Sequence, residues 1–202
     1  MHKEFTGSGD YAVATLQANT ANLENVATDG YYHVICHDKD GNVKWEDSIE
    51  NQVVQQGKIL AMNNTFYSAT AIVGPYLGLI GTYTGFNPTD TWASHSDWTE
   101  FTAYTVSGTA QRGTAVFTTA TGNNATAAGT NIVSSAATAV TYTIAGAGGT
   151  VAGCFLLTGT GATAAFSNTT SGTLWSAGAF SVSKTTTAGD TVTVTYTTTA
   201  TS

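Results

Sequence analysis

The chain contains unusually few charged residues. Only 9% of its 202 residues are Asp, Glu, Lys or Arg, whereas an average soluble domain has about 25%. Most of the surface must therefore be polar without being ionic. Hydrophobic residues make up 42%, which is enough for a core and argues against wholesale disorder. The length fits one large β domain, or a small domain followed by a medium one.

Long apolar runs and a secretory signal are also missing. The longest apolar run, residues 71–80, is too short and too interrupted by glycine and proline to span a bilayer, so we expect no membrane partner. Residues 1–15 contain no apolar stretch after a basic region, which predicts a protein made in a cytoplasm. Two cysteines are too few for a disulfide scaffold, and we expect Cys36 and Cys154 to be buried, reduced thiols.

The charges that are present lie mostly in one half of the chain. Residues 1–102 hold twelve of the thirteen acids and four of the six bases. Residues 103–202 hold only three ionic side chains: Arg112, Lys184 and Asp190. A net charge of −7 without a cluster of Lys and Arg argues against nucleic acid as a partner. The change in composition predicts two regions with different surfaces, with a boundary near residues 75–98.

We divide the chain into three parts. Residues 1–30 have widely spaced hydrophobic side chains and are predicted to form an extended N-terminal arm, with disorder as the alternative. Residues 31–75 are predicted to form a β-hairpin and one short helix. Residues 76–202 are predicted to form a Thr/Gly-rich β-sandwich. The expected fold is therefore mainly β, with an arm, a hairpin and a helix before an antiparallel, jelly-roll-like sandwich.

Local patterns support these assignments. The apolar run 31–36, the Asp- and Gly-containing turn 38–42 and the return 43–46 indicate a hairpin. Asp47 followed by Glu50 resembles a capping box and predicts a helix over 48–63. Further along, threonine alternates with apolar residues, as expected for half-buried strands, in 138–144 and 191–197. Two more strands are predicted in 153–157, which is apolar on both faces, and in 173–183.

Two clusters have the residue types of metal sites, but their spacing is wrong. Asp38, Asp40 and Asn42 alternate as in a calcium loop, yet the required glycine and final glutamate are displaced, so turn chemistry explains them better. His33 and His37 would lie about 13 Å apart on a strand, too far to share a zinc ion. We therefore expect no metal and no other cofactor.

Catalysis is also poorly supported. Residues 90–100 collect Ser, His, Asp and Glu, but residues so close in sequence seldom reach the geometry of a catalytic triad. Glycoside hydrolysis usually needs two carboxylates about 5–10 Å apart, and residues 103–202 contain only Asp190. We expect a protein that is not an enzyme.

Several segments resemble small virion proteins of tailed bacteriophages. The resemblance rests on WEDSIENQVV (residues 45–54), on TDTWASHSDWTEF (residues 89–101) and on the closing strands, and it covers most of residues 31–202. It implies a head decoration (cement) protein or a tail-fibre-like protein, and it implies no catalytic residues.

The expected function is to bind the outside of an assembled phage capsid and stabilise it. The alternative is a tail-fibre or adhesin module that binds host surface glycans. The expected partners are the major capsid protein lattice and other copies of the chain, as a dimer or trimer. The residues predicted to contact a partner are all large and apolar: Phe5, Tyr11, Leu16, Leu23, Trp45, Trp92 and Trp98.

Overall fold

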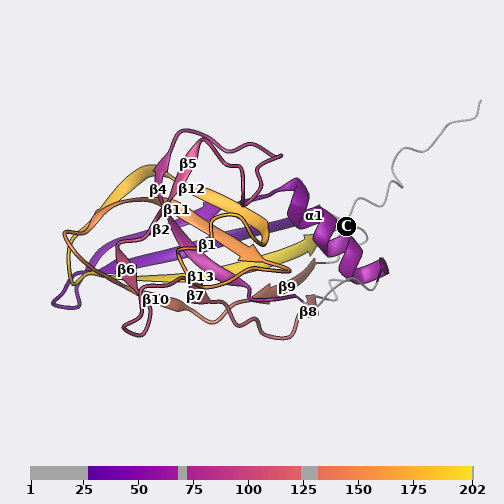
Figure 1. The fold of residues 1–202 in the computed structure, drawn as a ribbon. Helices are drawn as coiled ribbons and strands as arrows, with labels where there is room; N and C mark the ends of the chain where they lie inside the picture. Colours follow the sequence, from indigo (N-terminus) through magenta and orange to yellow (C-terminus); the bar gives the residue numbers. More distant parts are fainter. Residues whose placement is uncertain (1–26, 68–71, 124–131, 202) are drawn as a thin grey trace, which may run out of the picture.

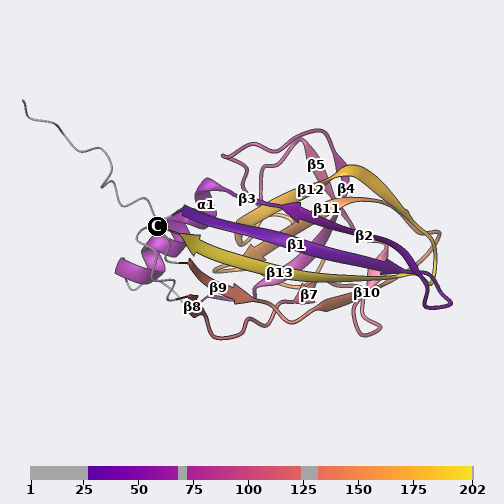
Figure 2. The ribbon, with the colours of Figure 1, turned by 180° about the vertical axis from the view of Figure 1, so that it is seen from behind.

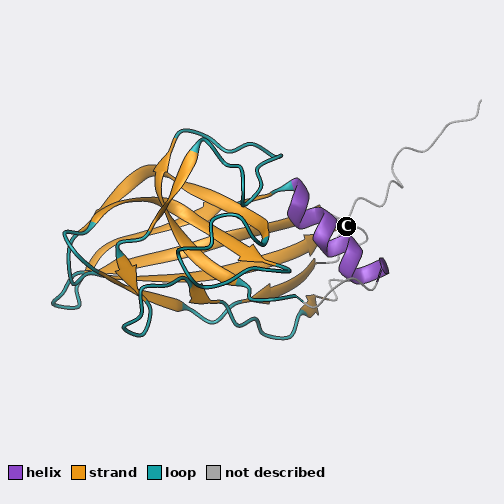
Figure 3. Cartoon of the chain, viewed as in Figure 1, coloured by secondary structure: helices purple, strands orange, loops and turns teal. Residues whose placement is uncertain are grey.

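Two antiparallel sheets lie face to face, and a helix crosses one end of them (Figures 1 and 3). The computed structural model describes residues 27–67, 72–123 and 132–201. This architecture confirms the predicted mainly β, antiparallel sandwich with a single short α-helix in the described part of the chain.

Each sheet has a main series of five strands with shorter strands at its margin. The first sheet runs, in order, through β2 (Val43–Glu50), β1 (Ala27–His37), β13 (Thr191–Thr201), β10 (Val140–Ile144) and β6 (Tyr104–Thr105), with β9 (Ile132–Ala136) beside β13 and β8 (Thr121–Asn123) beside β9. The second runs through β3 (Gln52–Val53), β12 (Thr173–Thr186), β11 (Gly149–Thr158), β4 (Tyr76–Tyr83) and β5 (Trp98–Phe101), with β7 (Gly113–Thr114) beside β4. Helix α1 (Gln55–Met62) continues into one turn of π-helix, η2 (Asn63–Tyr67).

The alternating sequence of β13 determines which face of the first sheet is buried. Val192, Val194 and Tyr196 are fully buried, while the intervening threonines are only partly buried. β10 repeats the pattern with buried Val140, Tyr142 and Ile144 between exposed threonines. Threonine suits these positions because its branched Cβ favours an extended backbone and its hydroxyl is hydrated without adding charge. Both strands were predicted from this alternation, and both predictions are confirmed.

The hairpin near the start of the chain is built into the first sheet. β1 pairs with β13 along its whole length, from Ala27 opposite Thr201 to His37 opposite Thr191, as Figure 2 shows. The region predicted as hairpin plus helix, 31–75, and the Thr/Gly-rich region, 76–202, therefore share a sheet.

Ion pairs also join the acidic half of the chain to the charge-poor half. Every ionic residue of 103–202 pairs with a residue of 1–102: Arg112 with Glu100 at 2.7 Å, Lys184 with Asp47 at 2.8 Å, and Asp190 with Lys44 at 2.7 Å. The uneven distribution of charge along the sequence thus does not separate two structural units.

The predicted helix over 48–63 begins too early, because α1 starts only at Gln55. Residues up to Glu50 instead continue β2, with Ile49 buried opposite Tyr32 of β1. Asp47 does not cap a helix, since its carboxylate pairs with Lys184. Pairing with β1 and burial of Ile49 therefore outweigh the local capping signal.

The second sheet is buried on both faces. Cys154 and Leu156 of β11 face the core between the sheets, whereas Phe155 and Leu157 face a second apolar cluster on the other side of the sheet. That second cluster includes Trp92 and Trp98. This arrangement explains the predicted run 153–157, which is apolar on both faces, and the prediction is confirmed.

Candidate functional site

A buried arginine organises the loops over the second sheet. Arg112 is fully buried and forms two 2.7 Å hydrogen bonds to the Glu100 carboxylate, through Nε to Oε1 and through Nη2 to Oε2. Its remaining N–H groups donate to the backbone carbonyls of Thr163, Ala165 and Asn168 at 2.8–3.0 Å. The guanidinium carbon lies 4.6 Å from the centre of the Trp92 ring.

The chemistry of this cluster is structural. A guanidinium has five N–H donors, and all five of Arg112 are bonded within the chain, so none is left for a ligand. Burial raises the pKa of Glu100 above its ordinary value, against the opposing effect of Arg112. Arg112 thus connects β5 to residues 163–168.

The loop predicted to gather Ser, His, Asp and Glu forms no catalytic arrangement among its described contacts. The His95 ring stacks on Trp98 with centroids 3.8 Å apart, and its Nδ1 lies 3.0 Å from the Trp98 carbonyl oxygen. The Ser96 hydroxyl donates to Asp97, and Glu100 is engaged by Arg112. The side chains therefore stabilise the loop.

Two of the predicted partner-contact residues lie inside this chain. Trp92 and Trp98 are 2% and 1% exposed, and both rings pack on Phe155. The prediction that they contact a partner is corrected here, because the outer face of the second sheet needs an apolar cover from the same chain. Trp45 of β2 is partly buried, packs edge-on against Phe180 and donates to the Thr185 carbonyl. The remaining four, Phe5, Tyr11, Leu16 and Leu23, lie outside the described residues.

The suspected calcium loop is a hydrogen-bonded turn. The Asp38 carboxylate accepts from the backbone N–H groups of Asp40 and Asn42, both at 2.9 Å, and from the Asn42 amide. These bonds hold the pKa of Asp38 below its ordinary value. Within residues 27–67, 72–123 and 132–201, no three His, Cys, Asp or Glu side chains could hold a metal ion together. No helix in these ranges is long and apolar enough to cross a membrane.

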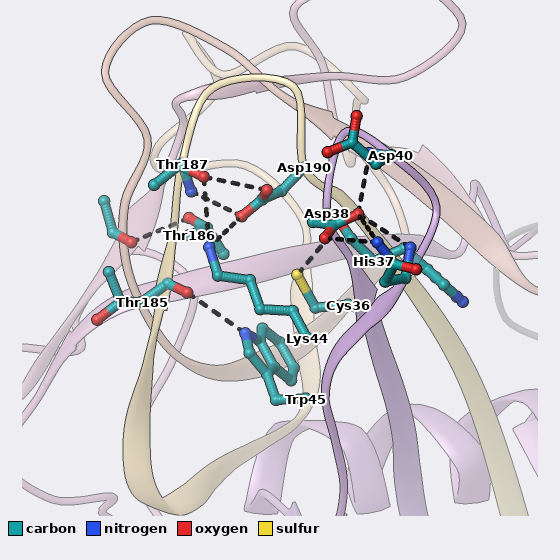
Figure 4. A network of polar contacts seen from close by, with 12 residues as sticks. Cys36, His37, Asp38, Asp40, Lys44, Trp45, Thr185, Thr186, Thr187 and Asp190 are labelled. Atoms are coloured by element: carbon teal, nitrogen blue, oxygen red, sulfur yellow. Dashed lines mark hydrogen bonds and ion pairs between the residues drawn. The ribbon is translucent and has the colours of Figure 1, made fainter.

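A second turn depends on a buried carboxylate, shown in Figure 4. Asp190 accepts from Lys44 Nζ at 2.7 Å, from the Thr187 N–H at 2.8 Å and from the Thr187 hydroxyl at 3.0 Å. Burial alone would raise the pKa of Asp190, but these bonds hold it below its ordinary value of 3.8. The ionised carboxylate therefore stabilises the folded state.

This carboxylate should make stability depend on pH. Its contribution should be complete above about pH 4, the ordinary Asp pKa, and should be lost as pH falls through the lowered pKa of the folded state. We expect Asp190→Asn to cost about 1–2 kcal/mol at neutral pH. Urea unfolding of both proteins between about pH 7 and pH 2 should show the gap narrowing with acid. A gap that stays constant or widens would contradict this role.

Both cysteines are free and buried, as the sequence predicts. Burial raises the pKa of Cys36 to about 11 and raises the pKa of Cys154 still further above its ordinary value. Because the thiolate is the reactive form, we expect neither thiol to react with a disulfide reagent at about pH 8 in the folded protein. Both should react after unfolding in urea, and rapid labelling of the folded protein would contradict the burial.

The surface best suited to bind a partner lies at the α1 end of the sandwich. Ile59, Met62, Tyr67 and Ile72 there have 51–79% of their surface exposed. Ile72 also lines a groove of about 220 Å³ whose lining is almost wholly apolar and includes Leu60, Pro75, Phe117 and Trp175. We call the four exposed side chains together with this groove the α1-end surface. Exposed apolar side chains on the same helical segment as an apolar groove are typical of interaction sites.

The chain enters the fold at the same end. Ala27, the first described residue, pairs with Thr201, and Thr201 pairs in turn with Ile132 on β9. Thr198 of β13 lines the apolar groove. Figure 1 shows α1 beside this end of β1 and β13. The start of β1 therefore lies at the same end of the sandwich as the α1-end surface.

Sequence reasoning missed the two features that matter most here. Arg112 stands out only as an isolated ionic residue in a charge-poor half, and this isolation is the one sequence signal for its burial and pairing. The α1-end surface combines residues of α1, β12 and segments far apart in sequence, so no local pattern reveals it. Comparisons with protein-family models, curated proteins and solved structures found no match to this chain.

Proposed function

We propose that this protein is a virion structural protein that binds the outside of an assembled phage capsid and stabilises it as a decoration protein. The resemblance of residues 45–54 and 89–101 to small phage virion proteins supports the proposal. A second support is the low content of free charge, because a threonine-covered sandwich suits one copy in a fixed assembly better than a monomer in free solution.

The observation that carries the proposal is the α1-end surface. We assign the capsid protein lattice as its occupant, because the start of β1 lies at this end, so the N-terminal arm predicted from the sequence would meet the same partner. Copies placed around a lattice axis could also contact one another as a dimer or trimer.

The proposed mechanism is mass action. A protein that binds the assembled shell but not its separated subunits shifts the equilibrium toward the shell. Particles that carry the protein should therefore rupture at a higher temperature than particles that lack it. Equal rupture temperatures would contradict the cement role.

The apolar character of the surface gives a second test. Attachment through the α1-end surface should survive about 1 M salt, where charges are screened beyond about 3 Å. Release of the protein from particles at that salt concentration would contradict the assignment and would instead favour docking through the acidic residues.

A further inference from the structure

A second hollow lies where the chain crosses from the first sheet to the second. Its volume is about 610 Å³, and its lining includes Glu50 and Gln52 on the crossing segment, Gln55 and Lys58 on α1, and Tyr83 on β4. A neighbouring hollow of about 350 Å³ shares Asp29, Glu50 and Asn51 with it and extends past Tyr31. We call the two together the sheet-crossing groove.

Hydrogen bonds fix the walls of this groove. The Gln55 N–H donates to the Pro88 carbonyl at 2.9 Å, which ties the start of α1 to the loop that follows β4. The Asn51 N–H donates to the Gly30 carbonyl at 3.0 Å, which ties the crossing segment to β1. The backbone of the groove is therefore already positioned, so ligand binding would cost little conformational entropy there.

Five of the polar side chains along the groove have no partner within the described part of the chain, whereas Asn51 donates to the Tyr196 hydroxyl. Asp29, Glu50, Gln52, Gln55 and Lys58 form no side-chain hydrogen bond or ion pair with any residue that the structure describes. The other acids of β2 differ, because Glu46 bonds to His33 and Asp47 to Lys184. Free carboxylates and amides thus gather in the groove and offer both acceptors and donors.

Each of the two hollows is lined by one exposed tyrosine. Tyr31 is 44% exposed and Tyr83 is 41% exposed. The Tyr83 ring is supported by Phe86, with centroids 4.7 Å apart, and Phe86 packs in turn on Trp98. Tyr83 is therefore held in place while much of its surface remains open to a ligand.

We propose that the sheet-crossing groove binds a short, neutral oligosaccharide. Sugar hydroxyls both donate and accept hydrogen bonds, which matches carboxylates and amides, and the C–H faces of sugar rings pack on aromatic rings. Two acids against one lysine give the groove a net negative charge, which disfavours phosphate and other anions. A wholly apolar ligand would cover the exposed carboxylates of Asp29 and Glu50 without giving them hydrogen-bond partners. The sheet-crossing groove shares no lining residue with the α1-end surface, although both include residues of α1.

The test is ligand-detected NMR on the full chain with maltotriose, cellotriose and triacetylchitotriose as neutral probes. We expect at least one of them to bind with a Kd of the order of 1 mM. Tyr83→Ala and Tyr31→Ala should each weaken that binding about threefold to tenfold, because each removes one stacking ring. Glu50→Gln should also weaken it, because a carboxylate accepts hydrogen bonds more strongly than an amide.

Tyr67→Ala is the matched control, since Tyr67 is 79% exposed but lies outside the groove. It should bind the probe as the unaltered protein does. Absence of binding by all three probes would overturn the proposal, as would equal binding by the Tyr31, Tyr83 and Tyr67 variants. Tighter binding of a sulfated oligosaccharide than of the neutral probes would also overturn it.

Discussion

Replacing Arg112 by methionine should lower the free energy of unfolding by about 3–5 kcal/mol, because it leaves the buried Glu100 carboxylate without its partner. The substitution also removes the donors to three backbone carbonyls that hold residues 163–168. For a chain of this length the melting temperature should fall by about 6–20 °C. Urea unfolding followed by tryptophan fluorescence measures the change directly, since Trp92 stacks on the guanidinium.

Lys184→Met is the matched control. Lys184 also pairs with a carboxylate and lies over an aromatic ring, but its side chain is 23% exposed and that of Asp47 is 24% exposed. Its loss should cost no more than about 1 kcal/mol. Adding Glu100→Gln to Arg112→Met should restore part of the lost stability, because the unpaired charge is then gone. Equal losses for the arginine and lysine variants would contradict the account of this cluster.

Replacing both Ile59 and Met62 by aspartate should weaken attachment to capsids about a hundredfold while leaving the fold intact. Each side chain is half exposed, so covering it completely contributes about 1.4 kcal/mol to binding. Losing both contributions, about 2.8 kcal/mol together, raises the Kd about a hundredfold. The measurement is a binding titration on particles that lack the protein, with the unfolding midpoint of each variant determined in parallel.

The control places the same two charges elsewhere. Val43 and Val182 are 59% and 69% exposed and lie on β2 and β12, outside the α1-end surface. Their replacement by aspartate should leave attachment unchanged. An equal loss of attachment in both double variants would show that added negative charge, and not the α1-end surface, determines binding.

The strands could be predicted because their pattern is local. Alternation in 138–144 and 191–197 needs only a buried face and a hydrated face, and β10 and β13 have both. The turn at 38–42 could also be predicted, because Asp38 bonds to backbone groups within four residues of itself.

The features that could not be predicted depend on partners distant in sequence. The start of α1 is set by the pairing of β2 with β1, which extends strand structure through a segment that resembles a helix start. Trp92 and Trp98 are buried because Phe155 of β11 requires a cover, and only the folded chain brings them together. The sheet-crossing groove likewise collects residues from β1, β2, α1, β4 and β12.

The low charge of the chain also gains a clearer meaning from the structure. The three ionic residues of 103–202 are all paired with residues of the first half, so they add no free charge to the Thr-rich strands. The free acids that the structure does describe include Asp29 and Glu50, which line one groove. Charge in this protein is used either to join the two halves of the fold or to line a groove that could hold a ligand.

A cryo-electron-microscopy map of the whole particle tests the central proposal most directly. It should show the β-sandwich on the outer face of the capsid shell, with α1 and the start of β1 toward the shell and the turn at 38–42 pointing away from it. Density confined to the tail, or a sandwich on the shell with α1 pointing outward, would contradict the proposal.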